Sequence, residues 1–213
     1  MANILKGTDK GLITKDNCAV AFIDIQPQMF FGVESAPRKL IMNNMLMLAK
    51  GAKLFEIPTV LTTVAAKSFT GYMLEELVKI FPEHKPIERT GMNSWDSEEF
   101  KKAVIAAGKK NIIVSGLWTE VCVCWPVLSL LEEGYNVYVV ADACGGISKV
   151  AHKAAMKRMT HAGATPVTAM QMIFEFQRDW ANKATYDGII GILRKHGGAY
   201  GVGIEYASTW GKS

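Results

Sequence analysis

Two cysteines stand two residues apart in "GLWTEVCVCW", the stretch from Gly116 to Trp125. Four roles fit such a pair: core packing, metal binding, a redox pair, or one nucleophile beside one packing residue. Free cysteine is most often a small buried hydrophobe, so packing is the default for Cys122 and Cys124. Zinc sites usually place two to four residues between paired cysteines and add a second ligand pair, and this stretch has neither feature.

Cys122 has the better position for chemistry. The spacing predicts a helix over residues 119–134 with Thr119 as its cap, which puts Cys122 in the first turn. A thiol there faces the positive end of the helix dipole, which favours the thiolate. The free backbone N–H groups of that turn could also hold an oxyanion. Cys124 would point away, because positions two apart do not share a helix face.

Short apolar runs alternate with amphipathic runs along the chain, and the apolar runs lack the polar alternation of half-exposed strands. Such strands, separated by helices, are typical of a parallel sheet that is covered on both faces. The sequence therefore predicts an α/β fold, a three-layer α/β/α sandwich with a mainly parallel, doubly wound sheet. Strands are predicted over 18–24, 58–64, 111–116, 135–142 and 164–169, and helices over 38–55, 71–81, 96–108, 119–134, 148–163 and 171–182.

Polar residues and a glycine stand at the predicted carboxyl ends of these strands, where open α/β sheets place their ligand crevice. Asp24 ends the first strand, Gly116 ends the strand before the cysteines, and Asp142 ends the next one. Taken alone, Asp24 could be a strand-end cap or a turn residue. A loop-capping role fits Asp142 as well as a catalytic role does.

Several motifs resemble those of one family. "AFIDIQPQMF", "GLWTEVCV" and "EEGYNVYVVADAC" resemble signatures of the isochorismatase-like cysteine hydrolases, a superfamily that includes nicotinamidases and N-carbamoylsarcosine amidohydrolase. "IPTVLTT", "IERTGMNSWDSEEF" and "FQRDW" are similar to the subgroup related to the bacterial protein YcaC. The resemblance runs from about Asp16 to Trp180, with the motifs in order, and implies an isochorismatase-like fold.

The resemblance also implies a catalytic set. Asp24 and Cys122 match the family's Asp and its nucleophile, and Arg89 stands where most members have Lys. The family's cis peptide bond would join Leu117 to Trp118. The backbone N–H groups of Trp118 and Cys122 would then form the oxyanion hole. Without the family pattern, Arg89 could equally be a surface or capping arginine.

The same resemblance points to Gln26, Phe30, Asn93 and Trp95 as substrate contacts. The simpler explanation is that the two polar residues are exposed side chains and that the two aromatic residues pack in the core. The function it implies is cysteine-dependent hydrolysis of a small amide or related C–N bond through a thioester acyl-enzyme. Two alternatives remain open. One is an isochorismatase-type vinyl ether hydrolase, which does not need the cysteine, and the other is a non-catalytic, redox-responsive oligomeric protein.

No metal and no other cofactor are expected. Nicotinamidases carry an Asp-x-His pattern with a further His after the second strand, whereas "TTVAAKSFTGYMLEEL" contains no His. The histidines, at positions 84, 152, 161 and 196, are dispersed along the chain, and a lone His is more often a structural residue than a ligand. Nicotinamide is therefore a less favoured substrate.

The composition limits partners and location. The 213 residues are 49% hydrophobic and 21% charged, which is ordinary for a globular protein. A net charge of +4 without a run of like charges does not indicate nucleic-acid binding. No 18-residue apolar stretch predicts a membrane span. The start "MANILKGTDKG" lacks a signal peptide's apolar core, and unpatterned cysteines suit the reducing cytoplasm.

The organisation predicted for the chain has two parts. Residues 1–183 would form the isochorismatase-like hydrolase domain. Residues 184–213 would form a C-terminal helix and a tail rich in Gly and aromatics, either a loosely held arm or an oligomer contact. The expected partners are a small-molecule substrate and, from the subgroup resemblance, further copies of the chain in a tetramer or octamer.

Overall fold

A six-stranded, all-parallel sheet forms the centre of the structure, a computed structural model that describes residues 11–210. The strand order is β3-β2-β1-β4-β5-β6, so the chain starts in the middle of the sheet and winds outwards in both directions. Residues 1–10, whose sequence lacks the apolar core of a signal peptide, lie outside the described residues, as do residues 211–213 of the tail. The strands are β1 (Cys18–Ile23), β2 (Thr59–Val64), β3 (Ile87–Arg89), β4 (Asn111–Gly116), β5 (Asn136–Val140) and β6 (Thr165–Val167).

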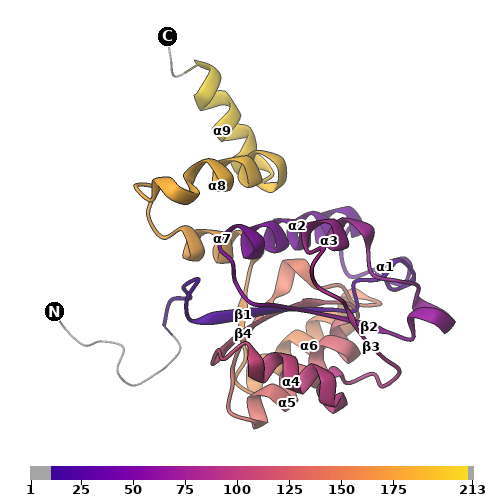
Figure 1. The fold of residues 1–213 in the computed structure, drawn as a ribbon. Helices are drawn as coiled ribbons and strands as arrows, with labels where there is room; N and C mark the ends of the chain where they lie inside the picture. The colour runs from indigo at the N-terminus through magenta and orange to yellow at the C-terminus, as the bar shows by residue number, and fades with distance from the viewer. Residues whose placement is uncertain (1–10, 211–213) are drawn as a thin grey trace.

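Helices cover both faces of this sheet (Figure 1). One layer contains α2 (Arg38–Leu54), α3 (Glu75–Ile80) and α7 (Ala169–Gln177). The other contains α4 (Glu98–Ala106), α5 (Cys124–Glu132) and α6 (Lys149–His161). The predicted three-layer sandwich with a doubly wound parallel sheet is confirmed. No helix within residues 11–210 is both long and apolar enough to cross a bilayer.

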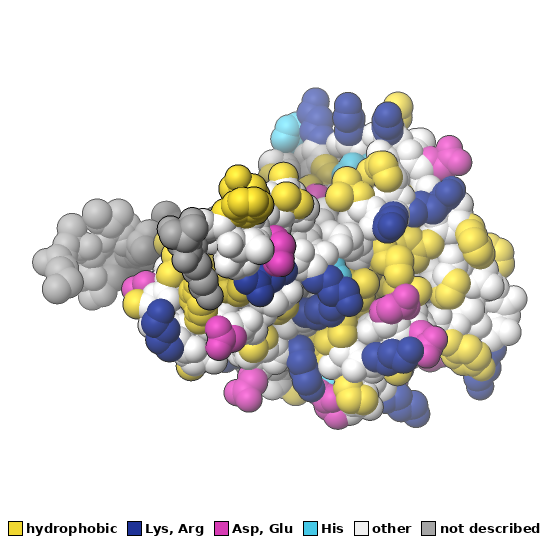
Figure 2. All heavy atoms as spheres, turned by 90° about the horizontal axis from the view of Figure 1, so that it is seen from above, with side chains coloured by type: hydrophobic (Ala, Val, Ile, Leu, Met, Phe, Trp, Pro, Cys, Tyr) yellow, Lys and Arg dark blue, Asp and Glu magenta, His cyan; other side chains and the backbone are white. Residues whose placement is uncertain are grey.

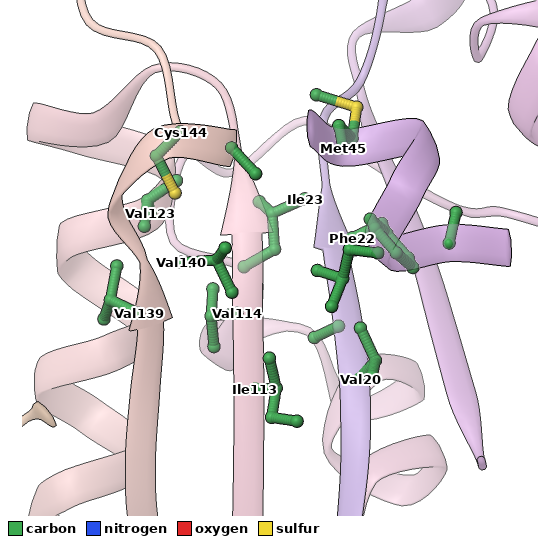
Figure 3. Close-up of a cluster of buried hydrophobic side chains, with 14 of the residues drawn as sticks. Val20, Phe22, Ile23, Met45, Ile113, Val114, Val123, Val139, Val140 and Cys144 are labelled. Carbon is green, nitrogen blue, oxygen red and sulfur yellow. The ribbon is translucent and has the colours of Figure 1, made fainter. Parts of the chain in front are cut away.

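The core lies where β1, β4 and β5 run side by side (Figure 3). Phe22 and Val140 are fully buried, and every position of β1 and β4 is buried. Met45 of α2 packs onto one face of these strands. Burial on both faces explains why these strands are continuous apolar runs rather than alternating ones.

The structure differs from the predicted elements at several boundaries. The edge strand β3 and the short helix α1 (Pro27–Phe31) were not predicted, since each spans only a few residues. The helix predicted over 171–182 ends at Gln177, because Arg178 adopts a left-handed φ of 61°. The helix predicted over 119–134 begins instead with a π-helical turn, η3 (Thr119–Val123), and only then continues as α5.

The segment after residue 183 folds into two helices, α8 (Lys183–His196) and α9 (Ala199–Trp210). α8 packs along α2, and α9 packs on α8 and projects away from the body of the molecule (Figure 1). The α8–α9 approach is close: a Cβ on Gly201 would lie 2.4 Å from the Leu193 carbonyl oxygen. α8 is therefore part of the folded body, while α9 extends from it.

His196 anchors the end of α8 to α2. Its Nδ1 lies 2.9 Å from Asn43 Oδ1, its Nε2 lies 2.8 Å from Lys50 Nζ, and its carbonyl accepts a 2.8 Å hydrogen bond from Asn43 Nδ2. Burial, followed by the charges of Lys50 and Lys195, lowers the pKa of His196 to about 4. The docked ring is therefore neutral, because a protonated ring would face a lysine at close range.

This docking predicts an acid-sensitive stability. Between the unfolded-state pKa of about 6.5 and the folded value, only the unfolded chain binds the proton, so stability is lost as the pH falls. We expect the free energy of unfolding to drop on the order of 1–3 kcal/mol more in wild type than in His196→Gln between pH 7 and pH 4. Urea unfolding at both pH values measures this, and His161→Gln, at an exposed His on α6, should behave like wild type.

Candidate active site

A buried ion pair joins the ends of two strands. Asp24 follows β1 directly and takes a left-handed φ of 55°, and Arg89 is the last residue of β3. Arg89 reaches past β2, which lies between β1 and β3. Its Nη1 donates a hydrogen bond to Asp24 Oδ1 and its Nη2 donates one to Asp24 Oδ2, both at 2.8 Å. The two side chains are 5% and 0% exposed. The pair is bidentate and desolvated, the strong form of such a contact.

Neighbouring groups hold this pair in place. Thr62, on β2, donates a 2.9 Å hydrogen bond to Asp24 Oδ1. Arg89 also donates to the carbonyl oxygens of Thr63 and Met92, both at 3.2 Å. From Thr62 and Arg89, Oδ1 accepts two hydrogen bonds and Oδ2 one, which leaves Oδ2 the greater acceptor capacity for another donor. Sequence reasoning missed Thr62, because an apolar strand with Thr residues gave no sign of which Thr faces the carboxylate.

Cys122 lies next to this carboxylate. It sits in η3, is 4% exposed, and its thiol hydrogen-bonds to Asp24. Burial, followed by the charge and the hydrogen bond of Asp24, raises the pKa of the Cys122 thiol to about 12. The charge of Arg89 and a hydrogen bond from the Trp118 backbone N–H act in the opposite direction.

The expectation that a helix start favours the thiolate of Cys122 is therefore wrong. Cys122 lies in a π-helical turn that precedes α5, and desolvation outweighs the positive groups around the sulfur. Thr119 does not cap the helix either. Its hydroxyl lies 2.9 Å from Nδ1 of His152 on α6, an interaction that the sequence did not indicate.

The peptide bond between Leu117 and Trp118 is cis, as the resemblance implied. The Trp118 backbone N–H points at the Cys122 sulfur. The Trp118 ring donates a 2.8 Å hydrogen bond from Nε1 to the Met29 carbonyl and lies over Gly32, where a Cβ would come within 2.7 Å of the ring. The region after β4 is thus tied to α1, the helix that follows Asp24.

Gln26 is fully buried and hydrogen-bonded within the protein. Its Oε1 accepts from the Val64 N–H at 2.9 Å, and its Nε2 donates to the Val64 carbonyl at 3.2 Å and to Thr70 Oγ1 at 2.6 Å. These bonds hold η1 (Ala66–Thr70) against the end of β1. The structure therefore gives Gln26 a positioning role in the loop beside Asp24.

Asn93 and Trp95 lie beside α5. Asn93 donates to Ser129, in the later part of α5, and its Oδ1 accepts from the Trp95 N–H. Trp95 packs edge-to-face on Tyr135, which precedes β5 and so marks the amino end of the sheet. After Arg89 the chain runs along α5 towards the amino end of the sheet, and Asn93 and Trp95 lie on this path.

The remaining predicted site positions have distinct surroundings. Phe30 is buried in α1, in the part of the chain that contacts the Trp118 ring. Asp142 accepts a 2.8 Å hydrogen bond from the Ala169 N–H and so caps α7. All four cysteines are free and buried. Within residues 11–210, no group of three or more His, Cys, Asp and Glu side chains is arranged to hold a metal ion.

Comparison with known proteins now gives the family. The model of the isochorismatase domain matches residues 18–171, which contain Asp24, Arg89 and Cys122. The chain belongs to the isochorismatase family. Among its relatives, the probable hydrolase YcaC of Escherichia coli is 38% identical over 185 residues, 86% of this chain and 88% of that protein. The relationship supports a hydrolase of the YcaC-related kind.

Solved structures of the isochorismatase family agree. YcaC from Pseudomonas aeruginosa, solved with hexane-2,5-diol and covalent acrylamide, is 40% identical, covers 93% of this chain and 98% of that one, and has a TM-score of 0.89. E. coli YcaC, described as an octameric hydrolase of unknown specificity, is 37% identical over 93% and 97% of the two chains, also with a TM-score of 0.89. A cysteine hydrolase from Pseudomonas syringae, 15% identical over 80% of this chain and 99% of that one, shares the fold at a TM-score of 0.67.

The buried pair predicts a strong energetic coupling between Asp24 and Arg89. Removing one partner leaves the other charge buried without compensation, so Arg89→Met should lower the free energy of unfolding by about 3–5 kcal/mol. Asp24→Asn keeps a residue that tolerates the left-handed backbone at this position. Chemical denaturation of the two single variants and the double variant measures the coupling. If the double variant loses as much as the sum of the two single losses, the pair is not coupled.

The raised pKa of Cys122 predicts that the rate of its alkylation rises steeply at alkaline pH. With a pKa of about 12, the thiolate fraction of Cys122, and hence its rate with iodoacetamide, should rise about tenfold per pH unit between pH 7 and pH 10. Asp24→Asn removes a charge that raises this pKa, so alkylation should become faster at pH 9. Peptide mass spectrometry measures the rate. Cys144 is the internal control, because Asp24 is not among the groups that raise its pKa.

Proposed function

We propose that this isochorismatase-family protein is a cysteine hydrolase that cleaves a small amide or related C–N bond through a thioester intermediate. One observation supports this above all: the Cys122 thiol lies beside the Asp24 carboxylate, which Arg89 holds with two hydrogen bonds. A thiol beside a fixed carboxylate is the pairing of nucleophile and base that acyl transfer needs.

In the resting state the proton stays on sulfur, because burial raises the pKa of Cys122 to about 12. Asp24 accepts that proton as the sulfur attacks the substrate carbonyl carbon, so the S–C bond forms while the S–H bond breaks. The unused acceptor capacity of Oδ2 suits this step. A buried thiolate is never formed in advance, which protects the thiol from unproductive reactions.

The tetrahedral intermediate carries its negative charge on the former carbonyl oxygen. We assign the backbone N–H groups of Trp118 and Cys122 as its donors, and the Trp118 N–H already faces the sulfur in the resting state. The C–N bond then breaks and the amine leaves with the proton from Asp24. Water attacks the thioester with Asp24 as base, which releases a carboxylic acid and restores the thiol.

Arg89 supplies a fixed charge in this scheme. Its guanidinium does not release a proton at working pH, so it cannot shuttle protons as a Lys could. It keeps Asp24 oriented, and its charge also favours the thiolate during attack. The proton therefore moves only between sulfur, Asp24 and the reacting groups.

The surroundings of the sulfur suit a small acyl group, since Cys122 is only 4% exposed. The likeness to octameric E. coli YcaC supports a homo-oligomer, a tetramer or an octamer. We also propose a cytoplasmic location, which the four free cysteines suit. We propose α9 as one contact in it. Val202, Tyr206 and Trp210 lie four residues apart on this helix and are 71%, 65% and 67% exposed.

The mechanism predicts the effect of two substitutions on hydrolysis of a panel of small primary amides, followed by ammonia release. Cys122→Ala should abolish turnover, because it removes the nucleophile. Asp24→Asn should slow it by about 10²–10⁴-fold, the usual contribution of a general base. Intact-mass spectrometry should detect an acyl adduct on wild type and none on Cys122→Ala.

Cys124→Ala, which removes a buried thiol outside the site, is the matched control and should retain turnover. Full activity in Cys122→Ala would refute the proposal. Turnover of isochorismate that is indifferent to Cys122 would instead favour vinyl ether hydrolysis. Sulfenic acid at Cys122 under mild peroxide, with no amide cleaved and no adduct formed, would favour a redox-responsive protein.

A further inference from the structure

A hollow lies on the face of the sheet opposite to the ion pair. Residues Thr63 and Glu88 are register partners on β2 and β3, and so are their neighbours Val64 and Arg89. Because side chains alternate between faces, Arg89 points to the Asp24 side while Glu88 points to the α3 side. The hollow, with a volume of about 440 Å³, is bounded by Glu88, Thr63 and residues of α3 and of the loops around it.

The walls of this hollow are largely apolar. Ala66 and Met73 are buried, and Tyr72, Val78 and Pro86 complete the apolar lining. Tyr72 is 71% exposed and Val78 40% exposed, so the hollow opens to the surface. A cavity of this size and character can bury the hydrocarbon part of a small ligand.

The charged groups of the hollow are not balanced. Its carboxylate, Glu88, is used internally: Oε1 accepts from the Ala66 N–H at 2.8 Å and Oε2 accepts from the Thr63 hydroxyl at 2.5 Å. Lys67 and Lys85 also line it, both exposed, and neither is paired with an acidic residue of residues 11–210. Two lysines against one occupied carboxylate leave a net positive charge over an apolar floor.

We propose that this hollow, behind β2 and β3, is a binding site for an amphipathic monoanion, such as a medium-chain carboxylate. The apolar walls bury the chain, and Lys67 and Lys85 hold the head group. The site is separate from Cys122, because the β2–β3 ladder lies between them, and it does not depend on the hydrolytic mechanism. Figure 2 shows the molecule from the side of α8, α9 and the layer with α3, where apolar side chains lie between Lys and Arg side chains.

Isothermal titration calorimetry of the full chain with octanoate tests this proposal. We expect one octanoate per chain, with an affinity that weakens as salt is added, since the head-group contacts are exposed. The uncharged analogue 1-octanol and the double variant Lys67→Gln/Lys85→Gln should each bind about tenfold more weakly. Val78→Trp, which places a large side chain in the mouth, should abolish octanoate binding.

Lys79→Gln is the matched control, because Lys79 is an exposed residue of α3 that does not line the hollow and pairs with Glu75. It should leave octanoate affinity unchanged. Equal binding to wild type and the double lysine variant, or no binding at all, would overturn the proposal. If octanoate fails to bind and Val78→Glu also dissociates the assembly in analytical ultracentrifugation, the hollow is a contact between copies of the chain instead.

Discussion

The pair of Asp24 and Arg89 is the contact on which the candidate active site depends. Two charges taken out of water are costly, and they are tolerated only with close geometry and further hydrogen bonds. The site meets both needs through the two 2.8 Å bonds between the side chains and the support of Thr62, Thr63 and Met92. The order β3-β2-β1 makes it possible, because it brings the carboxyl ends of both strands to one edge of the sheet.

The same burial changes how Cys122, the proposed nucleophile, would work. A thiol at a helix start would be expected to ionise readily, yet Cys122 is desolvated and faces a carboxylate. The carboxylate that opposes the free thiolate is also the group that can take its proton. In the proposed mechanism the Cys122 thiol keeps its proton until the substrate arrives. Arg89, whose charge does not change with pH, holds Asp24 in position to accept that proton.

The two faces of the β2–β3 ladder border different environments. On one face, Thr62 and Arg89 contribute to the buried polar site, while on the other, Thr63 and Glu88 border an apolar hollow with exposed lysines. Thr63 takes part in both, since its carbonyl accepts from Arg89 and its hydroxyl donates to Glu88. At the far end of the chain, α8 belongs to the body through His196, and α9 leaves it with its aromatic side chains exposed.

The sequence by itself determined the layered α/β architecture and the family, because unbroken apolar strands and ordered motifs are local signals. It also singled out Asp24, Arg89 and Cys122, although Arg89 and the cis bond after Leu117 came from resemblance rather than from residue chemistry. Only the tertiary structure decided the protonation of Cys122 and the roles of Gln26, Asn93, Trp95 and Thr62. Burial and hydrogen-bond partners are set by residues distant in the chain, such as Val64 for Gln26 and Ser129 for Asn93. No local pattern carries that information, whereas strand periodicity does.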